Sequence, residues 1–529
     1  MREVPTAAET VRERLQAEVD SYVEELFDGY QVNPQDDDRR REGKTIRDPI
    51  LGFHQLSPLE VEILDCPLVQ RLRYVHQNAL AYLVYPSANH TRLEHSLGMA
   101  KIVRDVATAF DEAGRTPLLF SRESVGELRL AALLHDTGHG IFSHLSESLI
   151  EQHWYHDVAL LKTIPPFEGK KAGEILSYML CVSKKFTEFL DDVIARHNSP
   201  YDPRRIAGYI LGRVNSRPLD YYKGDLITGP LDADKLDYIA RDSYFTGIRS
   251  EVDIDQIIRS LRVWRSPKGI GRALVIALSG VSFVEQMHFA RHLLFPAMYH
   301  HQKVRALECM VGGIFETIWN NPASVREPRL RFERITDLLR VSEAEFLTLG
   351  SREPLIANKI KRLQNRTLFR RALHISASVI KGPLERTAYA NLVNLGSGDA
   401  RAVEEIALIR REIFRALPDR AKRDSAGRPL DVHDVWLDIP DTPKPSKDIS
   451  RCYVDMGGRK PARLRDLFPI DSWLQSYADN KWTAHVFGNP DHTHLIALNK
   501  AAISVLQGRF QFTLLPRASS ECKLEHPSL

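Results

Sequence analysis

Four residues have the types and the order needed to hold a divalent metal: His95, the adjacent pair His135 and Asp136, and Asp234. Neutral imidazoles and ionised carboxylates supply the nitrogen and oxygen ligands that Mn, Fe, Mg, Co and Zn accept. The His-Asp pair follows the apolar residues 128–134, which predict a buried helix. Ligands from three helices can converge on one ion and leave positions open for water and substrate, so the pattern predicts a hydrolytic metal centre.

Two further histidines, His139 and His144, follow the His-Asp pair closely. On a helix, the i, i+3 spacing places Glu147 beside His144. A carboxylate that holds an imidazole fixes its tautomer and raises its pKa, which suits a general acid that protonates a leaving oxygen. The alternative is a helix N-terminal turn, with Ser143 as the cap and Ser146 or Glu147 completing it. Both interpretations can hold together.

The composition is that of an ordinary globular protein. The chain has 529 residues, 43% of them hydrophobic and 27% charged, and a net charge of +3. This length predicts about two or three structural units. The small net charge does not require nucleic acid or a membrane as a partner. Binding of nucleic acid is possible, but the composition does not indicate it. Five scattered cysteines without a CxxC pair, and no signal-like apolar stretch, predict a cytoplasmic protein.

The hydrophobic pattern predicts a mostly α-helical fold in four segments. Residues 1–42 are expected to form an N-terminal helix, used for packing or oligomer contact, and a polar linker, with a binding arm as the alternative. Residues 43–310 read as a helical catalytic domain. Residues 311–430 continue as a helical extension, in which the basic stretch 358–373 is a solvated face or, alternatively, meets the phosphates of a regulator.

The last segment, 431–529, is expected to be a small α+β lobe. The proline-rich stretch 440–448 marks a break. Beyond it, the stretches 484–488 and 510–515 read as strands among helices. The predicted fold class is therefore mostly α, with a helical catalytic core and a smaller α+β C-terminal lobe.

The three ligand-bearing segments resemble the H…HD…D signature of the HD phosphohydrolase superfamily. They read HTRLEHSLGMAKIV at 90–103, LRLAALLHDTGHGIFSHLSE at 128–147 and LDADKLDYIARD at 231–242. More narrowly, the chain resembles the deoxynucleoside triphosphate triphosphohydrolases. The stretch 44–77 strengthens the match, because metal ligation alone gives no reason for it. Each of the four ligands taken singly reads as a buried hydrogen-bonded residue, and their joint order with the flanking sequence favours the metal site.

The resemblance implies the roles of further residues. His139 and His144 would reach the substrate phosphates. The positions expected to contact substrate are Arg92, Lys235 and Arg291 for phosphate, Tyr238 and Asp242 for phosphate and sugar, Gln77 for the sugar 3′-hydroxyl, and Tyr299 for stacking against or excluding groups at the sugar. For Arg291 and Tyr299, ordinary helix packing is the alternative.

The sequence departs from the family pattern at two places. The usual apolar neighbour of Gln77 is Asn78 here, which leaves sugar and base selectivity open. Family members also carry a further His-Glu pair near the stretch 165–180, where this chain has no histidine. Either His144 with Glu147 suffices, or turnover is slow, or the chain is a degenerate member.

A regulatory nucleotide site is a further expectation from the resemblance. Its residues would be Lys44, Asp65, Gln70 and Arg73, with Asp and Gln reading a guanine edge and Lys and Arg taking phosphates. The alternative is that this stretch is a general helix signature, in which Arg71 and Arg73 form ion pairs. The residues of the family's second regulatory site are not found in 250–263.

The leading hypothesis is metal-dependent hydrolysis of deoxynucleoside triphosphates (dNTPs) to deoxynucleoside and inorganic triphosphate. It implies a dNTP substrate, Mg on its phosphates, a dNTP or GTP activator, a homo-oligomer (dimer or tetramer), and a role in dNTP pool control or phage defence. No membrane partner is expected. The alternatives are another HD phosphohydrolase (a nucleotide phosphomonoesterase, phosphodiesterase or alarmone hydrolase) or a catalytically weak protein that binds nucleotide or nucleic acid.

Overall fold

The computed structural model confirms the predicted class, because 62% of the chain is helical and 10% is in strands. The structure describes residues 6–30, 42–113, 119–212, 218–266, 271–382, 385–398, 400–441, 451–457, 460–468, 472, 476 and 481–520. The predicted linker and the predicted break therefore fall largely outside the described residues. No helix in the described part of the chain has the length and apolarity needed to cross a membrane.

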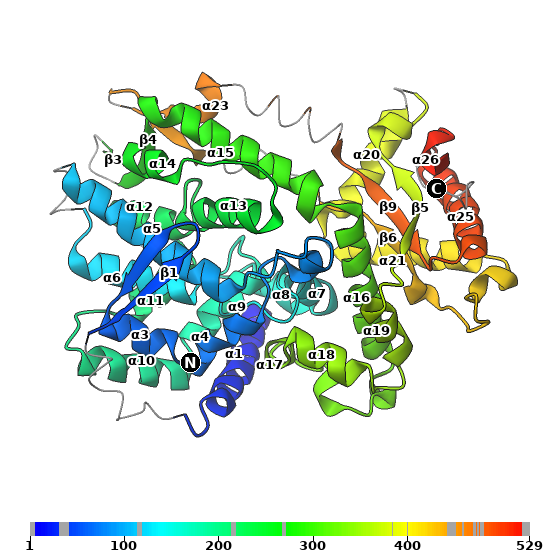
Figure 1. The fold of residues 1–529 in the computed structure, drawn as a ribbon, viewed down its shortest axis with the longest axis horizontal. Coiled ribbons are helices and arrows are strands. Elements are labelled where there is room, and N and C mark those ends of the chain that lie inside the picture. Colours follow the sequence, from blue (N-terminus) through cyan, green and yellow to red (C-terminus); the bar gives the residue numbers. More distant parts are fainter. Residues whose placement is uncertain are drawn as a thin grey trace.

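Helices dominate the first three fifths of the chain (Figure 1). They are α1 (Ala7–Leu26), α3 (Pro58–Leu64), α4 (Pro67–Gln70), α5 (Arg92–Glu112), α6 (Arg122–Leu134), α7 (His144–His153), α8 (Tyr155–Leu161), α9 (Ala172–Cys181), α10 (Lys184–Arg196), α11 (Pro203–Ile210), α12 (Tyr221–Ile227), α13 (Ala233–Thr246), α14 (Ile254–Ser260), α15 (Val281–Leu294) and α16 (Gln302–Asn320). The helix α5 is central among them, because both α6 and α13 pack against it.

The predicted N-terminal helix is confirmed as α1, and it packs into the main core. Its residues Val11, Leu15 and Val19 are buried and follow one another at intervals of four residues, which places them on one helix face. The helix lies against α8, α9 and α10. A capping box between Thr6 and Glu9 begins the helix, with Glu9 N donating to Thr6 Oγ1 at 3.2 Å. These contacts agree with the packing interpretation of its pattern.

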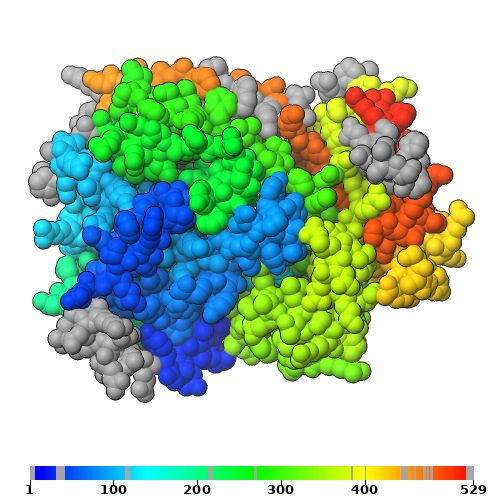
Figure 2. Space-filling view, in the orientation of Figure 1, coloured from blue at the N-terminus to red at the C-terminus, as the bar shows by residue number. Residues whose placement is uncertain are grey.

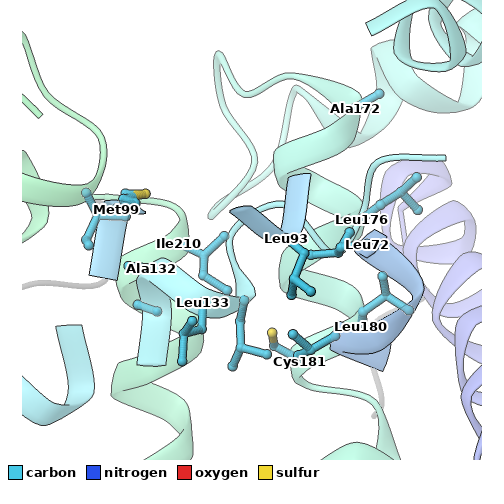
Figure 3. Close-up of a cluster of buried hydrophobic side chains, with 14 of the residues drawn as sticks. Leu72, Leu93, Met99, Ala132, Leu133, Ala172, Leu176, Leu180, Cys181 and Ile210 are labelled. Atoms are coloured by element: carbon cyan, nitrogen blue, oxygen red, sulfur yellow. The ribbon is translucent and has the colours of Figure 1, made fainter. Parts of the chain in front are cut away.

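A large apolar core holds the helices that carry the candidate ligands. Figure 3 shows part of it, where Leu93 of α5, Leu133 of α6, and Leu176 and Leu180 of α9 meet. All four side chains are buried. Burying each leucine side chain stabilises the folded state by about 1.5–3 kcal/mol relative to leaving it exposed to water. Because close packing resists displacement, the ends of these helices are held in fixed relation to one another.

Within the described residues, three small sheets accompany the helices. The strands are β1 (Lys44–Asp48), β2 (Gly52–Leu56), β3 (Leu261–Arg265), β4 (Arg272–Ala277), β5 (Arg370–Ile375), β6 (Val435–Asp438), β7 (Tyr453–Asp455), β8 (Ala462–Arg463) and β9 (Ala484–Gly488). β1 and β2 form a hairpin, the second sheet has the order β3-β4-β7-β8, and the third has the order β5-β9-β6. In the second sheet β4 pairs in parallel with β7, so a C-terminal segment completes a sheet begun near the helices that carry the candidate ligands.

Much of the C-terminal part forms a second lobe beside the part that carries the candidate ligands (Figure 2). Its helices, together with those that lead into it, are α17 (Asp337–Arg340), α18 (Glu343–Gly350), α19 (Ala357–Gln364), α20 (Arg386–Asn394), α21 (Ala400–Arg415), α25 (His492–Phe510) and α26 (Arg517–Ser520). The short helix α23 (Leu464–Leu467) instead contacts β8, and its residue Leu464 is part of the first apolar core. A separate apolar core runs from Ala372 to Ala518, between the third sheet and α21 and α25. This core begins well before residue 431, where the sequence placed the start of the lobe.

Two local predictions in this lobe are wrong and one is confirmed. The stretch 358–373 is not a continuous helix, because α19 ends at Gln364 and β5 follows, paired with β9. The stretch 510–515 is not a strand, because α25 continues to Phe510 and Gln511 ends it in the left-handed conformation. The strand at 484–488 is confirmed as β9, the middle strand of the sheet.

Candidate metal centre and active site

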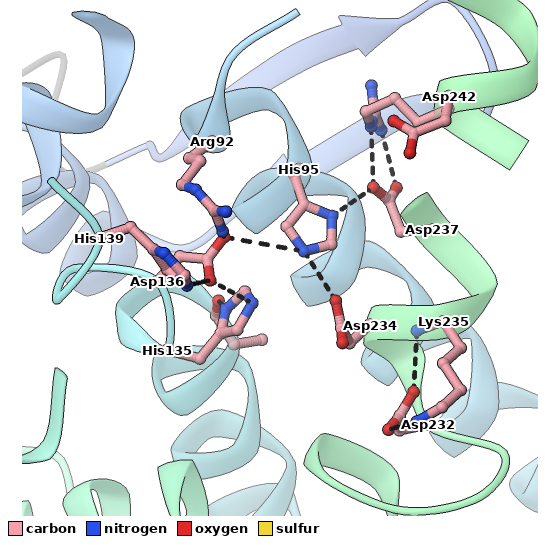
Figure 4. Close-up of polar contacts among 12 residues, drawn as sticks. Arg92, His95, His135, Asp136, His139, Asp232, Asp234, Lys235, Asp237 and Asp242 are labelled. Atoms are coloured by element: carbon pink, nitrogen blue, oxygen red, sulfur yellow. Dashed lines mark hydrogen bonds and ion pairs between the residues drawn. The ribbon is translucent and has the colours of Figure 1, made fainter. Parts of the chain in front are cut away.

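The four predicted metal ligands lie at the ends of three helices. His95 is in the first turn of α5, and His135 and Asp136 directly follow α6. Asp234 is in the first turn of α13, whose N-terminal residue Asp232 accepts a hydrogen bond from Lys235 N at 2.8 Å. Helix ends leave the local backbone free to turn, and here they bring residues distant in sequence together (Figure 4).

The side chains of this cluster are within coordination reach of one another. Ligand atoms of His95, His135 and Asp234 all lie within 4.8 Å of each other. His95 Nε2 is 3.0 Å from Asp234 Oδ1. The carboxylate of Asp136 lies beside them, with Oδ1 3.3 Å from His135 Nε2 and Oδ2 3.9 Å from His95 Nε2. The structure therefore brings all four predicted ligands together.

The tautomers of both histidines suit metal ligation. His95 Nδ1 bonds Asp237 Oδ2 at 2.7 Å, and His135 Nδ1 bonds the Ala132 carbonyl at 2.7 Å. Donation from Nδ1 leaves the lone pair on Nε2. Both Nε2 atoms are buried and make no well-aligned hydrogen bond in the structure, and their nearest polar neighbours are the carboxylates of Asp234 and Asp136. Two such nitrogens between two carboxylates fit a divalent cation of the Mn, Fe, Co, Zn or Mg class.

Asp237, which the sequence reasoning missed, orients His95. It receives two hydrogen bonds of 2.8 Å from Arg241 on the next turn of α13. Burial acts to raise the pKa of Asp237, but Arg241 and His95 lower it to about 2, so the group is ionised. A Cβ on Gly98 of α5 would come within 1.9 Å of Asp237 Oδ1, so the close contact requires glycine there. The segment LDADKLDYIARD contains this residue one helical turn after Asp234.

Arg92 positions Asp136, whereas the resemblance predicts that it faces substrate phosphate. Its side chain is buried, and Nη1 donates to Asp136 Oδ2 at 2.6 Å. Burial acts to raise the pKa of Asp136, but Arg92 and the neighbouring histidines hold it well below its usual value. The Nε of Arg92 donates to Ser143 Oγ, so Ser143 occupies the N-terminal position of α7 without capping it by its side chain. Arg92 Nη2 is buried without a partner in the structure.

The expected contact between His144 and Glu147 is present. His144 Nδ1 lies 3.4 Å from Glu147 Oε2, and His144 is exposed while Glu147 is buried. Burial opposes the charge on Glu147, but Lys171 and His144 lower its pKa below its usual value. His139 lies alongside, with Nε2 3.5 Å from Asp136 Oδ1. Burial and the charge of Arg92 lower the pKa of His139 to about 3, so it is a neutral imidazole.

A buried polar network lies at the far end of α13, around Asp242. Asn78 Nδ2 donates to Asp242 Oδ1 at 2.7 Å, and His90 Nε2 lies 2.8 Å from the same oxygen. The Tyr299 hydroxyl donates to the other oxygen. Tyr238, between Asp234 and Asp242 on the helix, has its pKa raised by burial. The structure thus unites Asp242 and Tyr299 with Asn78, the residue at which the sequence departs from the family.

Three other predicted substrate contacts have different outcomes. Lys235 bonds Asp232 and the Gly229 carbonyl, each at 2.8 Å, so its ammonium is used by the N-terminus of α13. The amide oxygen of Gln77 is buried without a hydrogen-bond partner in the structure. The guanidinium of Arg291 lies over the Phe295 ring, 5.8 Å from its centre, near the start of the turn that carries Tyr299.

The four predicted regulatory residues form two neighbouring pairs at the surface. Lys44 Nζ binds Asp65 Oδ2 at 2.8 Å, and Arg73 Nε donates to Gln70 Oε1 at 3.1 Å. Gln70 also donates to the carbonyl next to Asp65, at Leu64. Arg71 donates to the Thr137 carbonyl, and in the described part of the chain it forms no ion pair of the kind that the alternative interpretation expects.

Family models match most of the described chain. A model described as the HD domain matches residues 92–241, which span all four candidate ligands. A model described as the HD associated region matches residues 252–509.

Curated relatives are similar at moderate identity. An uncharacterised protein of Methanocaldococcus jannaschii is 29% identical over 66% of this chain and 63% of its own length. Proteins named deoxynucleoside triphosphate triphosphohydrolase SAMHD1 are 29% identical in Danio rerio and in Homo sapiens, each over 51% of this chain and 44% of the relative. The chain therefore spans less than half the length of these SAMHD1 proteins.

Solved structures share the fold. A hypothetical protein from Aquifex aeolicus superimposes with a TM-score of 0.58 at 22% identity, covering 88% of this chain and 100% of that one. A phosphohydrolase from Bacteroides thetaiotaomicron gives a TM-score of 0.58 at 20% identity, covering 84% and 100%.

Proposed function

We propose that this chain, which belongs to the HD-domain proteins, is a metal-dependent phosphohydrolase that converts dNTPs to deoxynucleoside and inorganic triphosphate. The observation that carries the proposal is the pair of buried Nε2 atoms of His95 and His135, which make no well-aligned hydrogen bond, beside the carboxylates of Asp136 and Asp234. The names of the SAMHD1 relatives support dNTPs as the substrate class.

The residues around the metal site divide the work. His95, His135, Asp136 and Asp234 would hold the metal, which would lower the pKa of water and neutralise charge on a phosphoryl oxygen. Asp237 orients His95, and Arg92 holds Asp136 in place.

Water attacks the α-phosphorus and forms a new bond between phosphorus and oxygen. The bond between that phosphorus and the 5′-oxygen of the nucleoside breaks, so inorganic triphosphate and the deoxynucleoside separate. His144, paired with Glu147, donates a proton to that oxygen. The polar wall of Asn78, Asp242 and Tyr299 receives the sugar, at the other end of the α13 face that begins with Asp234.

A product assay tests the proposed reaction directly. The purified protein is incubated with each dNTP, singly and mixed, with Mn or Mg, and products are separated by HPLC. Equal amounts of deoxynucleoside and triphosphate support the proposal. Release of pyrophosphate or orthophosphate alone contradicts the proposed bond and favours another HD phosphohydrolase activity.

Regulation and assembly are part of the same proposal. The surface pairs Lys44–Asp65 and Gln70–Arg73 bind an activating dNTP or GTP in a cytoplasmic homo-oligomer, a dimer or tetramer. The cellular role is control of dNTP pools or defence against phage. Adding GTP to single-dNTP reactions, while measuring mass by light scattering, tests both points. An unchanged rate and a constant monomer mass contradict them.

A further inference from the structure

The start of α9 lies directly against the segment that carries His139 and Glu147. Gly173 N donates to Glu147 Oε1 at 3.2 Å, and Gly138 N donates to Ser177 Oγ at 2.8 Å. A Cβ on Gly173 would lie 3.0 Å from both Glu147 Oε1 and the His139 ring. The contact is tight, so the residue that precedes α9 is held beside the candidate catalytic groups.

That residue is Lys171, in the stretch where the family pattern has a His-Glu pair. Its Nζ lies 3.8 Å from Glu147 Oε2, and its side chain is 67% exposed. Such a long contact leaves ammonium donors available, because a lysine has three of them. The charge of Glu147 is the largest cause that raises the pKa of Lys171, and Glu174, Asp441 and Asp234 raise it further. The lysine is therefore a cation at neutral pH.

The surroundings of Lys171 explain what such a cation is needed for. Two cations expected to bind the substrate phosphates are used within the protein, Arg92 by Asp136 and Lys235 by Asp232. The carboxylates around Lys171 repel a polyanion, because like charges that focus in one site oppose its entry. The exposed ammonium of Lys171 beside Glu147 offsets this repulsion and offers charge-assisted hydrogen bonds to phosphate oxygens.

We propose that Lys171 is a substrate-binding residue that contacts the polyphosphate chain of the substrate. The proposal rests on the proposed function, since it names a contact in the same site. Lys171 thus supplies by charge part of what the missing His-Glu pair supplies in relatives, and the chain need not be a degenerate member.

The test measures binding of inorganic tripolyphosphate, by calorimetry, to Lys171→Gln, Lys171→Arg and the matched control Lys170→Gln. Lys170 is the neighbouring cation, and it is held by Glu174 at 3.7 Å with its side chain mostly buried. We expect Lys171→Gln to weaken binding at least about tenfold, as loss of a charged hydrogen bond does. Lys171→Arg should keep binding within about threefold, and Lys170→Gln should leave it unchanged.

The outcomes separate this inference from the proposed function. If dNTPs are hydrolysed but Lys171→Gln binds tripolyphosphate like the wild type, the inference is wrong and the function stands. If Lys171→Gln lowers only kcat, Lys171 merely positions Glu147 and the inference is also wrong. If tripolyphosphate binds through Lys171 but no dNTP is hydrolysed, the proposed function fails instead. Thermal unfolding of each variant confirms that the exposed substitution leaves the fold intact.

Discussion

The two ends of α13 hold their carboxylates in opposite ways. At the N-terminal end, Asp234 lies among imidazole nitrogens of His95 and His135 that make no well-aligned hydrogen bond in the structure. At the C-terminal end, both oxygens of Asp242 are engaged by protein groups. These groups are Asn78, His90 and Tyr299. One end is incomplete without a ligand, and the other is complete by itself.

The difference between the two ends of α13 shows which end lowers the stability of the fold and which end raises it. A buried polar atom without a partner costs about 1–3 kcal/mol, whereas a satisfied network rigidifies its surroundings. The Asp234 end is therefore stabilised by whatever cation binds there, while the Asp242 end is a preformed wall. Substitutions at the two ends should consequently differ in whether they change metal content.

The largest effect is expected at the incomplete end, from Asp136→Ala. Removing a ligand should abolish stoichiometric metal and lower hydrolysis by at least about a hundredfold, because loss of even an outer partner of a metal ligand costs about 10–100-fold. Metal content by mass spectrometry and the HPLC product assay measure both. His156→Ala is the control, because this exposed histidine also precedes an aspartate. Retained metal in Asp136→Ala would contradict the assigned centre.

A smaller effect at the same end is expected from Asp237→Asn. The amide keeps the shape but loses the charge that orients His95, so metal affinity should fall about 10–100-fold. A competition titration with a chelating dye measures the affinity. If this variant binds metal as tightly as the wild type, Asp237 does not orient His95 for metal binding.

At the complete end, Asp242→Asn should leave metal content unchanged. Loss of the charged acceptor removes strong hydrogen bonds from Tyr299 and Asn78, each about 1.5–3 kcal/mol, so the wall that we propose receives the sugar should loosen. We expect KM for dNTP to rise about tenfold or more. Steady-state kinetics on metal-saturated protein give the value. Loss of metal in this variant would show that the two ends are not independent.

The smallest effect on hydrolysis is expected from a substitution in an ion pair away from α13. Such a substitution serves as a control for the variants at both ends of that helix. Glu316 accepts two hydrogen bonds from Arg410, at 2.8 and 2.9 Å, and one contact from His433. Burial acts to raise the pKa of Glu316, but Arg410 and His433 lower it to about 2. A depressed pKa contributes stability above the unfolded value, near pH 4.5, and this stability is lost as pH falls toward 2.

The measurement is the free energy of unfolding against pH. Wild-type protein should lose on the order of 2 kcal/mol from this group between about pH 4.5 and 2. Glu316→Gln should lack that part of the acid dependence and hydrolyse dNTP normally at neutral pH. Equal acid dependence in both proteins would show that the pair does not contribute.

The sequence was most informative where chemistry constrains residue type and order. His95, His135, Asp136 and Asp234 could be selected because metal ligation demands those side chains, and the structure places them together. The partners of Arg92 and Lys235 could not be inferred in the same way. Arg92 is bound to Asp136 and Ser143 from distant segments, and only tertiary packing decides that these bonds replace a contact with phosphate.

The fold was less predictable where local pattern and long-range pairing disagree. The stretch around β5 reads LFRRAL at 368–373, where apolar and basic residues come in pairs that also suit a helix, and its strand is fixed by pairing with β9 more than a hundred residues later. The stretch 510–515 alternates like a strand, yet it lies outside the named strands, and only Leu514 makes an isolated bridge, to Ile380. Burial against distant elements decided both cases.

The parallel pairing of β4 with β7 bears on how the protein is made. Val454 pairs with Ile276 only after the ribosome has synthesised the intervening helices and the strands β5 and β6. Until then the edge of β4 is open, and open edges invite pairing between nascent chains. Translation that stops short of residue 453 should therefore yield aggregates, although every residue of the candidate metal centre has already left the ribosome.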